Sequence, residues 1–169
     1  ATYDLDFEGT YLINGKDIYK MSDEERSIFR RRSIGFIFQF FNLLPILTAK
    51  ENIELAASLD GAEVDSKMVE ELVKVLGLKE RLNHFPNQLS GGEQQRVSIG
   101  RALAYKPEII LADEPTGNLD KKNSEIIIDL LKLFAKKYGI TVVMITHDLN
   151  IASAADRIIK IEDGKIVSD

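Results

Sequence analysis

Two adjacent carboxylates, Asp113 and Glu114, follow a short apolar run at residues 109–112. A continuous apolar run of this length is typical of a strand buried on both faces of a parallel sheet. Because side chains alternate along an extended chain, the two carboxylates point to opposite sides and suit two different tasks. Asp113 can hold a magnesium ion, directly or through water. Glu114 can orient an attacking water molecule and partly deprotonate it. A polar turn after a strand is the alternative interpretation.

Two further apolar runs end in polar residues. Residues 34–38 stop at Gln39, and residues 141–145 stop shortly before His147. In open α/β sheets ligands bind outside the carboxyl ends of the strands, so we expect Gln39, Glu114 and His147 to share one site. There His147 can hold a transferred phosphate or the attacking water in line. A lone histidine with a structural role is the alternative.

A third feature is a helix start that carries two glycines. Ser90 and Glu93 have the spacing of a capping box, and Gly91 and Gly92 remove side chains from the first turn. The amides of that turn lie at the positive end of the helix dipole and can bind an anion such as a phosphate. The alternative is an ordinary capped helix whose glycines permit close packing. The apolar positions behind this start are Val97, Ile99, Ala102 and Leu103.

The composition is that of a globular protein of ordinary size. The 169 residues are 44% hydrophobic and 29% charged, with a net charge of -5. No apolar run approaches the roughly 18 residues that a membrane span requires. No basic stripe is visible, which argues against nucleic acid as the principal partner. The chain has no cysteine, so disulfides and thiolate metal sites are excluded and a reducing cytosolic setting is permitted.

The remaining elements alternate between helix and strand. Asn14-Gly15 and Asp163-Gly164 predict hairpin turns near the two ends. Residues 42–88 are helical without a strong strand, which predicts a helical subdomain inserted into a core that contains the sheet. We expect helices over residues 22–32, 48–59, 65–76, from 90, 121–138 and 149–155, and hairpin strands over 10–13, 16–19, 157–161 and 165–167.

Two segments between these elements are unusual. Residues 40–45 form a very apolar loop, which is either a buried connection or a patch that binds a partner, since loops normally lie on the surface. The basic run Arg30-Arg31-Arg32 ends the first helix, and we expect it to be a solvated helix end without a further role.

Together these motifs resemble those of the ATP-binding cassette (ABC) ATPases, the family named for the nucleotide-binding subunits of ABC transporters. Residues 89–96 are similar to the family's signature motif, with Glu93 where many members have glutamine. Residues 38–48 and 113–120 most resemble the branch that serves lipoprotein release, macrolide efflux and antimicrobial-peptide export. The other motifs follow in the family's order: Gln39 matches the Q-loop, residues 109–114 match Walker B with its catalytic glutamate, residues 117–120 match the D-loop, and His147 matches the switch histidine.

The resemblance implies an α/β fold of the P-loop NTPase type, with a mostly parallel sheet, an inserted helical subdomain and short antiparallel hairpins at both ends. It implies ATP and Mg²⁺ as ligands, with Asp113 and Gln39 at the metal. In the family's head-to-tail dimer, ATP lies between the P-loop of one subunit and the signature helix of the other. The catalytic residues implied are Glu114, His147, Gln39 and Asp120, and those that contact the partner's nucleotide are Ser90, Gly91, Gly92 and Glu93.

The resemblance also implies a partner and a location. A subunit of this kind binds a membrane permease at the cytoplasmic face of the membrane and couples ATP hydrolysis to transport of a lipophilic or peptide-like substrate. We expect residues 40–44 and the helical subdomain to form the permease groove. The dimer is a homodimer or a pseudo-symmetric pair, in which Asp120 lies across the interface.

One family motif is absent from the chain. The P-loop pattern G-x-x-x-x-G-K-[ST] does not occur, because Gly15-Lys16 and Gly164-Lys165 lack both the upstream glycine and the following hydroxyl residue. Residues 4–14 resemble the segment after the P-loop helix, so we expect the missing part to lie before Ala1. The chain is therefore interpreted as a partial ABC ATPase domain over residues 1–169, with core parts at 1–41 and 106–169 and a helical subdomain at 42–105.

Two alternative functions follow from the same residues. One is a soluble ABC ATPase of DNA repair or translation, which long coiled coils or basic arms would favour, and this chain has neither. The other is an inactive fragment or an interaction module, because without the P-loop the chain should bind ATP poorly in its own half-site.

Overall fold

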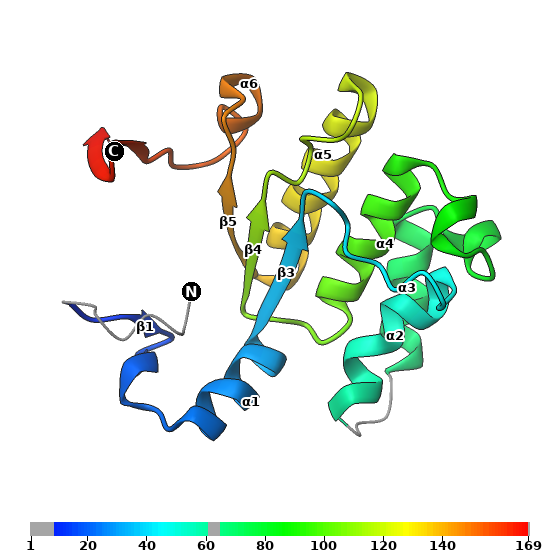
Figure 1. The fold of residues 1–169 in the computed structure, drawn as a ribbon, viewed down its shortest axis with the longest axis horizontal. Helices are drawn as coiled ribbons and strands as arrows, with labels where there is room; N and C mark the ends of the chain where they lie inside the picture. Colours follow the sequence, from blue (N-terminus) through cyan, green and yellow to red (C-terminus); the bar gives the residue numbers. More distant parts are fainter. Residues whose placement is uncertain (1–8, 61–64, 169) are drawn as a thin grey trace.

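A three-stranded parallel sheet forms the centre of the molecule (Figure 1). The computed structural model describes residues 9–60 and 65–168. Strand β4 (Ile109–Asp113) lies between β3 (Ile34–Phe38) and β5 (Thr141–Ile145). Parallel strands need long crossover connections, which here are residues 39–108 and the segment that contains helix α5 (Lys121–Tyr138). The three strands are those expected from the apolar runs.

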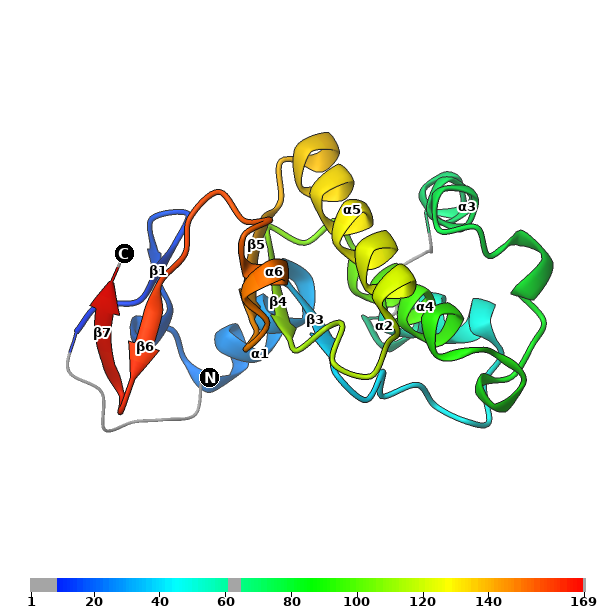
Figure 2. The same cartoon turned by 90° about the horizontal axis from the view of Figure 1, so that it is seen from above.

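Helices α4 (Gly91–Leu103) and α5 cover one face of this sheet. Figure 2 shows both helices on the same side of the strands, with α3 farther out. A Cβ atom at Gly35 would lie 2.7 Å from the carbonyl oxygen of Ala102, so glycine lets α4 approach β3 closely. The largest core cluster lies on this face and includes Ile37, Val97, Ile99, Leu103, Ile110, Ile127 and Phe134.

The opposite face of the sheet is more open, which differs from the expectation that all three strands are buried on both faces. Val143 is 46% exposed and Ile145 is 64% exposed. A smaller cluster, formed by Ile13, Ile18, Phe29 and Ile34, packs against Phe36, Ile109 and Leu111. That cluster brings β1 (Leu12–Ile13), η1 (Ile18–Lys20) and α1 (Asp23–Ser33) onto β3 and β4, and the described residues leave this face of β5 uncovered. An apolar run predicts a strand, but it does not say what packs on each side.

The helices between β3 and α4 begin at side-chain caps. Thr48 and Glu51 form a reciprocal pair of hydrogen bonds at the start of α2 (Ala49–Asp60), and Asp65 accepts from the Met68 amide at the start of α3 (Ser66–Val75). The expected helix break at Gly61 lies outside the described residues. Two short 3₁₀ helices follow, η2 (Lys79–Arg81) and η3 (Pro86–Gln88).

The apolar loop after β3 is exposed and tied down at its base. Phe40 is 74% exposed and Leu44 is 42% exposed, so the alternative of a buried connection is wrong for these side chains. Asn52 of α2 is fully buried, accepts a hydrogen bond of 2.8 Å from the Leu44 amide and donates to the Leu47 carbonyl at 3.0 Å. These hydrogen bonds satisfy the buried side-chain amide of Asn52 and hold the end of the loop at the start of α2.

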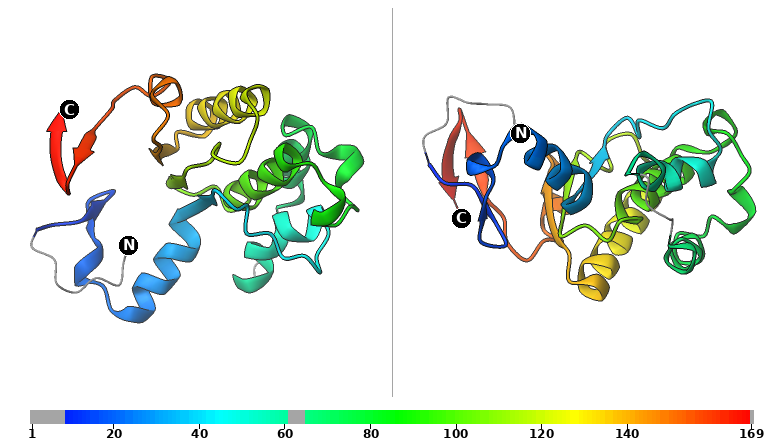
Figure 3. Two further views of the ribbon diagram at one scale, coloured as in Figure 1. Left: turned by 45° about the horizontal axis from the view of Figure 1, so that its top comes forward. Right: turned by 90° about the horizontal axis from the view of Figure 1, so that it is seen from below.

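Antiparallel hairpins lie near both ends of the described chain, as predicted. Asn14-Gly15 and Asp163-Gly164 both have two positive φ angles, the geometry of a tight hairpin turn. Figures 2 and 3 show the two hairpins at the end of the molecule that lies away from α3. Their strands are β1 (Leu12–Ile13) with β2 (Lys16–Asp17), and β6 (Lys160–Glu162) with β7 (Lys165–Ser168).

Several expected boundaries shift. The second strand of the first hairpin stops at Asp17, because the Asp17 side chain accepts from the Tyr19 amide and starts a 3₁₀ helix, η1 (Ile18–Lys20). Helix α6 (Leu149–Ala152) is shorter than expected, and β6 begins at Lys160. Helix α1 (Asp23–Ser33) starts at the predicted Ser22 cap. In α5 the buried stripe includes Ile128, while Ile126 is 37% exposed.

Candidate functional site

The three strands end in register at one edge of the sheet. Asp113 of β4 pairs with Phe38 of β3 on one side and with Ile145 of β5 on the other. The residues that follow this row therefore leave the sheet next to one another. The expectation that polar residues from three distant segments meet at a common edge is confirmed for the backbone.

Glu114 adopts a strained backbone conformation at this edge. Its φ angle is +43°, a region that residues with a Cβ atom rarely occupy. The Glu114 amide donates to the Ile145 carbonyl at 3.0 Å, so the first residue after β4 is still anchored to β5. The carboxylate accepts from the Thr146 hydroxyl at 3.2 Å and from the His147 amide at 2.9 Å. Two groups that follow β5 thus hold this carboxylate, and the end of β5 itself holds the Glu114 backbone amide.

The His147 ring lies directly against this carboxylate. Its Nδ1 atom is 2.7 Å from Glu114 Oε1, while 84% of the His147 side chain is exposed and only 18% of the Glu114 side chain. The hydrogen bond to Glu114 and the charge of that carboxylate raise the pKa of His147, with a smaller contribution from Asp148. The arrangement therefore pairs a partly buried carboxylate with an exposed imidazole that can also contact another anion.

Gln39 lies against the turn that follows Glu114. A Cβ atom at Gly117 would be 2.8 Å from Gln39 Nε2, and the Asn118 side-chain amide donates to the Gln39 carbonyl at 2.9 Å. These contacts join the segment after β3 to the segment after β4. Asp113 is exposed at the end of its strand. The described residues contain no group of three or more His, Cys, Asp or Glu side chains placed to bind a metal.

The side chains of Asp113 and Gln39 nevertheless carry the kind of oxygen ligands that a magnesium ion prefers. They supply a carboxylate and an amide oxygen from neighbouring strand ends. Mg²⁺ prefers such oxygen ligands, is commonly held by one or two protein groups, and keeps several waters and substrate oxygens in its shell.

Asp120 caps helix α5. Its carboxylate accepts from the Asn123 amide at 2.8 Å and from the Asn123 side chain at 2.9 Å. These hydrogen bonds lower the pKa of Asp120. The side chain is exposed, and it lies in the same turn as Gly117 and Asn118.

The start of α4 is the predicted capping box. The Ser90 amide donates to Glu93 Oε2 at 2.8 Å, and the Glu93 amide donates back to the Ser90 hydroxyl at 3.3 Å. Arg81 of η2 donates to the second carboxylate oxygen of Glu93 at 2.7 Å. The backbone hydrogen bond from Ser90, together with Arg81, lowers the pKa of Glu93 to about 2 in spite of its burial.

The two glycines of this helix start differ in their surroundings. A Cβ atom at Gly92 would lie 2.3 Å from Asn123 Oδ1, whereas one at Gly91 would meet its nearest atom, in Leu119, at 3.6 Å. Gly92 is buried against α5 and Gly91 is partly exposed. Close packing, the alternative weighed for both glycines, therefore accounts for Gly92 and leaves Gly91 for another explanation.

Sequence reasoning missed Thr146, Gln95 and Arg101. Gln95 is fully buried, and its side chain donates to the Pro115 carbonyl at 2.6 Å. Arg101 donates to the carbonyls of Phe41 and Asn42. A signal was present for Gln95, because it stands four residues before Ile99 on the apolar side of a helix.

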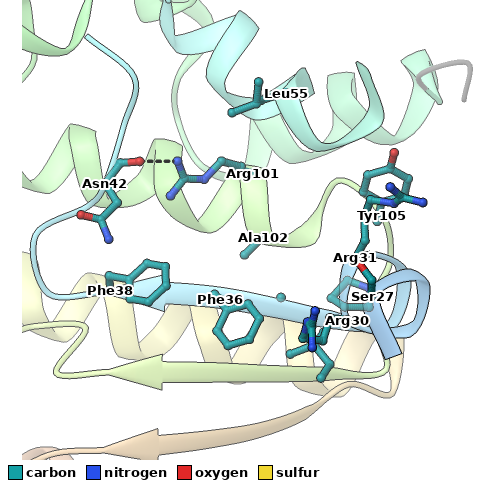
Figure 4. A pocket seen from close by; sticks show the side chains of 13 residues that line it. Ser27, Arg30, Arg31, Phe36, Phe38, Asn42, Leu55, Arg101, Ala102 and Tyr105 are labelled. Carbon is teal, nitrogen blue, oxygen red and sulfur yellow. Dashed lines mark hydrogen bonds between the residues drawn. The ribbon is translucent and has the colours of Figure 1, made fainter. Parts of the chain in front are cut away.

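A cavity of about 500 Å³ lies beside the open edge of β3 (Figure 4). The expected permease groove comprises residues 40–44 and the helical subdomain, and the cavity lining includes Asn42 of that loop with Leu55 and Tyr105 of residues 42–105. Arg30 and Arg31 of the basic run at the end of α1 also line the cavity, and Arg31 is exposed, as expected for a solvated helix end. The lining also includes Phe36, Phe38, Arg101 and Ala102.

Comparisons with known proteins agree with this geometry. The family described as "ABC transporter" matches residues 4–117. The chain is 48% identical to the "Uncharacterized ABC transporter ATP-binding protein MJ1508" of Methanocaldococcus jannaschii, over 99% of this chain and 75% of that protein. It is 49% identical to the "Macrolide export ATP-binding/permease protein MacB" of Bartonella henselae, over 95% of this chain. The chain spans only 24% of that relative's length.

Solved structures give the same result. The ATP-binding cassette MJ0796, in a dimeric post-hydrolysis state bound to ADP and Pi, superposes with a TM-score of 0.82 at 46% identity. The match covers 95% of this chain and 72% of that one. The chain therefore belongs to the ABC transporter ATPase family, and its fold is the family's mixed α/β cassette. Within residues 9–60 and 65–168, no helix combines the length and apolar character of a membrane span.

Proposed function

We propose that the chain is part of the ATP-binding and ATP-hydrolysing subunit of an ABC transporter. The observation that carries the proposal is the contact between the Glu114 carboxylate and the His147 ring. Glu114 Oε1 and His147 Nδ1 are 2.7 Å apart, just beyond the paired ends of β4 and β5. A carboxylate that can orient and deprotonate water, beside an imidazole that can donate a hydrogen bond to a phosphate, is suited to hydrolysis of a phosphoanhydride. Membership in the family raises the expectation that the phosphoanhydride is ATP.

In this proposal Glu114 orients the attacking water and accepts its proton. Its strained backbone and its hydrogen bonds from Thr146 and His147 hold the carboxylate in one position, which favours a reaction that depends on orientation. The exposed imidazole of His147 donates to the γ-phosphate. Asp113 and Gln39 would hold Mg²⁺, which would supply charge neutralisation at the phosphate oxygens.

The proposal places a second subunit's nucleotide at the start of α4. Ser90, Gly91, Gly92 and Glu93 form that start, and the exposed Ser90 with the open space at Gly91 supports an approach by a phosphate. Asp120 would lie across the interface. The solved relative MJ0796 is dimeric, which supports a head-to-tail dimer of this chain or a pseudo-symmetric pair.

The cavity beside β3 is proposed as the surface that binds a membrane permease. Phe36, Phe38 and Ala102 provide apolar contact area, and the exposed Phe40 lies in sequence between Phe38 and Asn42, which both line the cavity. The relative MacB is a macrolide export protein with ATP-binding and permease parts. We therefore propose a peripheral location at the cytoplasmic face of the membrane and export of a lipophilic or peptide-like substrate. Residues 42–105 form the proposed helical subdomain.

The test is the Glu114→Gln variant of the full-length gene product. We expect turnover to fall at least about 100-fold, because an amide cannot accept the proton, while Mg-ATP binding persists. Glu70→Gln in α3 is the matched control, since it makes the same chemical change on an exposed carboxylate outside the site. Retained hydrolysis in Glu114→Gln would remove Glu114 from the role of general base.

The 169-residue chain alone tests the alternative of an inactive fragment. Because it lacks the P-loop pattern, we expect weak ATP binding in a magnesium-dependent titration. Tight binding would contradict the role given to the P-loop. Co-purification of the full-length gene product with a membrane protein supports transport, whereas association with ribosomes or nucleic acid supports the other class.

A further inference from the structure

Helix α4 carries two polar side chains that reach the segments beside the catalytic edge. The first is Gln95, which is fully buried. Its Nε2 donates to the Pro115 carbonyl at 2.6 Å and lies 3.5 Å from the Phe38 carbonyl. Pro115 directly follows Glu114, and Phe38 directly precedes Gln39. A single amide group of α4 is therefore placed between the ends of β3 and β4.

The second is Arg101, two turns farther along the same helix. Its guanidinium donates to the Asn42 carbonyl at 2.5 Å and to the Phe41 carbonyl at 2.9 Å, and Figure 4 shows the bond to Asn42. Phe41 and Asn42 have φ angles of +59° and +50°. Two consecutive left-handed residues that are not glycine form a strained turn, which persists only when its surroundings hold it.

Both side chains act as donors to backbone carbonyls, and this determines what can replace them. In the described part of the chain Gln95 Oε1 has no hydrogen-bond partner, so the contribution of Gln95 is its NH₂ group. Arg101 is partly buried and offers a planar fork to two adjacent carbonyls, a geometry that lysine cannot reproduce.

We infer that Gln95 and Arg101 are positioning residues through which helix α4 holds the backbone beside Glu114 and the turn after Gln39. The inference rests on the proposed function, in which Glu114 and Gln39 act on ATP. The start of α4 is also the proposed contact for the partner's nucleotide. A displacement of this helix is thus transmitted to both catalytic segments by direct hydrogen bonds.

The experiment measures steady-state ATP hydrolysis by the full-length gene product with Gln95→Met or Arg101→Lys. We expect kcat to fall about tenfold in each variant, because small displacements of reacting groups cost rate, while KM for ATP changes less than about twofold. Ser98→Ala is the matched control, since the Ser98 hydroxyl is buried on the same helix and has no partner among the described residues. Unchanged kcat in both variants overturns the inference.

A Gln95→Glu variant separates positioning from packing. Burial raises the pKa of the introduced carboxyl, whose protonated form can donate to the Pro115 carbonyl and whose ionised form cannot. We expect kcat relative to the wild type to recover as the pH falls. If the kcat of Gln95→Glu relative to the wild type stays constant, or decreases as the pH is lowered, the donor role of Gln95 is contradicted.

Backbone hydrogen exchange keeps the two proposals distinguishable. If the wild type does not hydrolyse ATP, the proposed function fails, but exchange still reports on the held segments. We expect faster exchange at residues 40–42 in Arg101→Lys and at residues 114–118 in Gln95→Met, relative to Ser98→Ala. Exchange equal to that of the control overturns the positioning role whatever the activity.

Discussion

The edge formed by the strand ends and the start of helix α4 use polar groups in different ways. At the strand ends, Glu114 and His147 contact each other, and the His147 ring is largely exposed. At the start of α4, Ser90 and Glu93 bond to each other, Glu93 also accepts a hydrogen bond from Arg81, and Gly92 packs on α5. Both regions contain motif residues, but their contacts have different consequences.

We infer from this difference that the contacts at the strand ends serve the reaction, whereas the contacts at the start of α4 serve the stability of the fold. The His147 contact is made by an exposed side chain, so removing it should change reactivity more than folding. The contacts of Glu93 and Gly92 join η2, α4 and α5, so removing them should change stability. Three substitutions and one titration test this division.

The largest effect is expected for His147→Ala in the full-length gene product. Turnover should fall about 100-fold, the usual scale for loss of a positioned proton donor. The urea midpoint of unfolding should not move, because the side chain is 84% exposed. A clear fall in the urea midpoint of His147→Ala would show instead that the His147 side chain contributes to the stability of the fold.

Gly92→Ala should lower the free energy of unfolding by about 1 to 2 kcal/mol, because the new methyl group overlaps the Asn123 side chain. Gly91→Ala is the control and should be neutral or stabilise by up to about 1 kcal/mol, since its nearest contact is an ordinary 3.6 Å. Urea unfolding measures both. In an Asn123→Ala background the cost of Gly92→Ala should shrink, and a constant cost would mean that another contact is responsible.

Glu93→Gln should cost about 0.5 to 1 kcal/mol at pH 7, because the capping bond survives and the partly exposed ion pair with Arg81 is lost. The pKa of Glu93 is lowered to about 2, below the 4.5 of a free carboxyl. Its ionised form therefore stabilises the fold above pH 4.5, and the contribution is lost as the pH falls toward 2. Unfolding at pH 7 and at pH 3 should show a smaller difference between wild type and variant at the lower pH.

The smallest effect is a titration. The pKa of His147 is raised above 6.5 by Glu114, so the pair is favourable below that value and is lost as the pH rises through the folded pKa. An NMR titration of the imidazole should give a pKa above 6.5 that falls in Glu114→Gln. A value unchanged by the substitution would show that the two side chains do not interact in solution.

Sequence reasoning located the strands, the caps and the shared edge because these follow from local patterns. Apolar runs predicted β3, β4 and β5, and the Ser90 to Glu93 spacing predicted the capping box. The common edge followed from a rule about parallel sheets, which needs no knowledge of side-chain positions. The family resemblance added roles to residues that these patterns had already singled out.

Other features depend on contacts between distant segments and could not be predicted. The left-handed backbone of Glu114 and the two donors from Thr146 and His147 arise where the ends of β4 and β5 meet. The packing of Gly92 on Asn123 depends on how close α4 lies to α5. Periodicity predicts which side of a helix is buried, but it does not identify the neighbour.

The order of the strands in the sheet has a consequence for how the protein folds. Strands β4 and β5 are separated only by α5 and its turns, whereas β3 pairs with β4 across residues 39–108. Closing the longer connection costs more chain entropy, so β4 and β5 should pair before β3 joins them. Glu114 and His147 would then meet early, and Gln39 would reach the site only when the helical insertion has folded. Partly folded chains would therefore contain the acid–histidine pair without the glutamine that completes it.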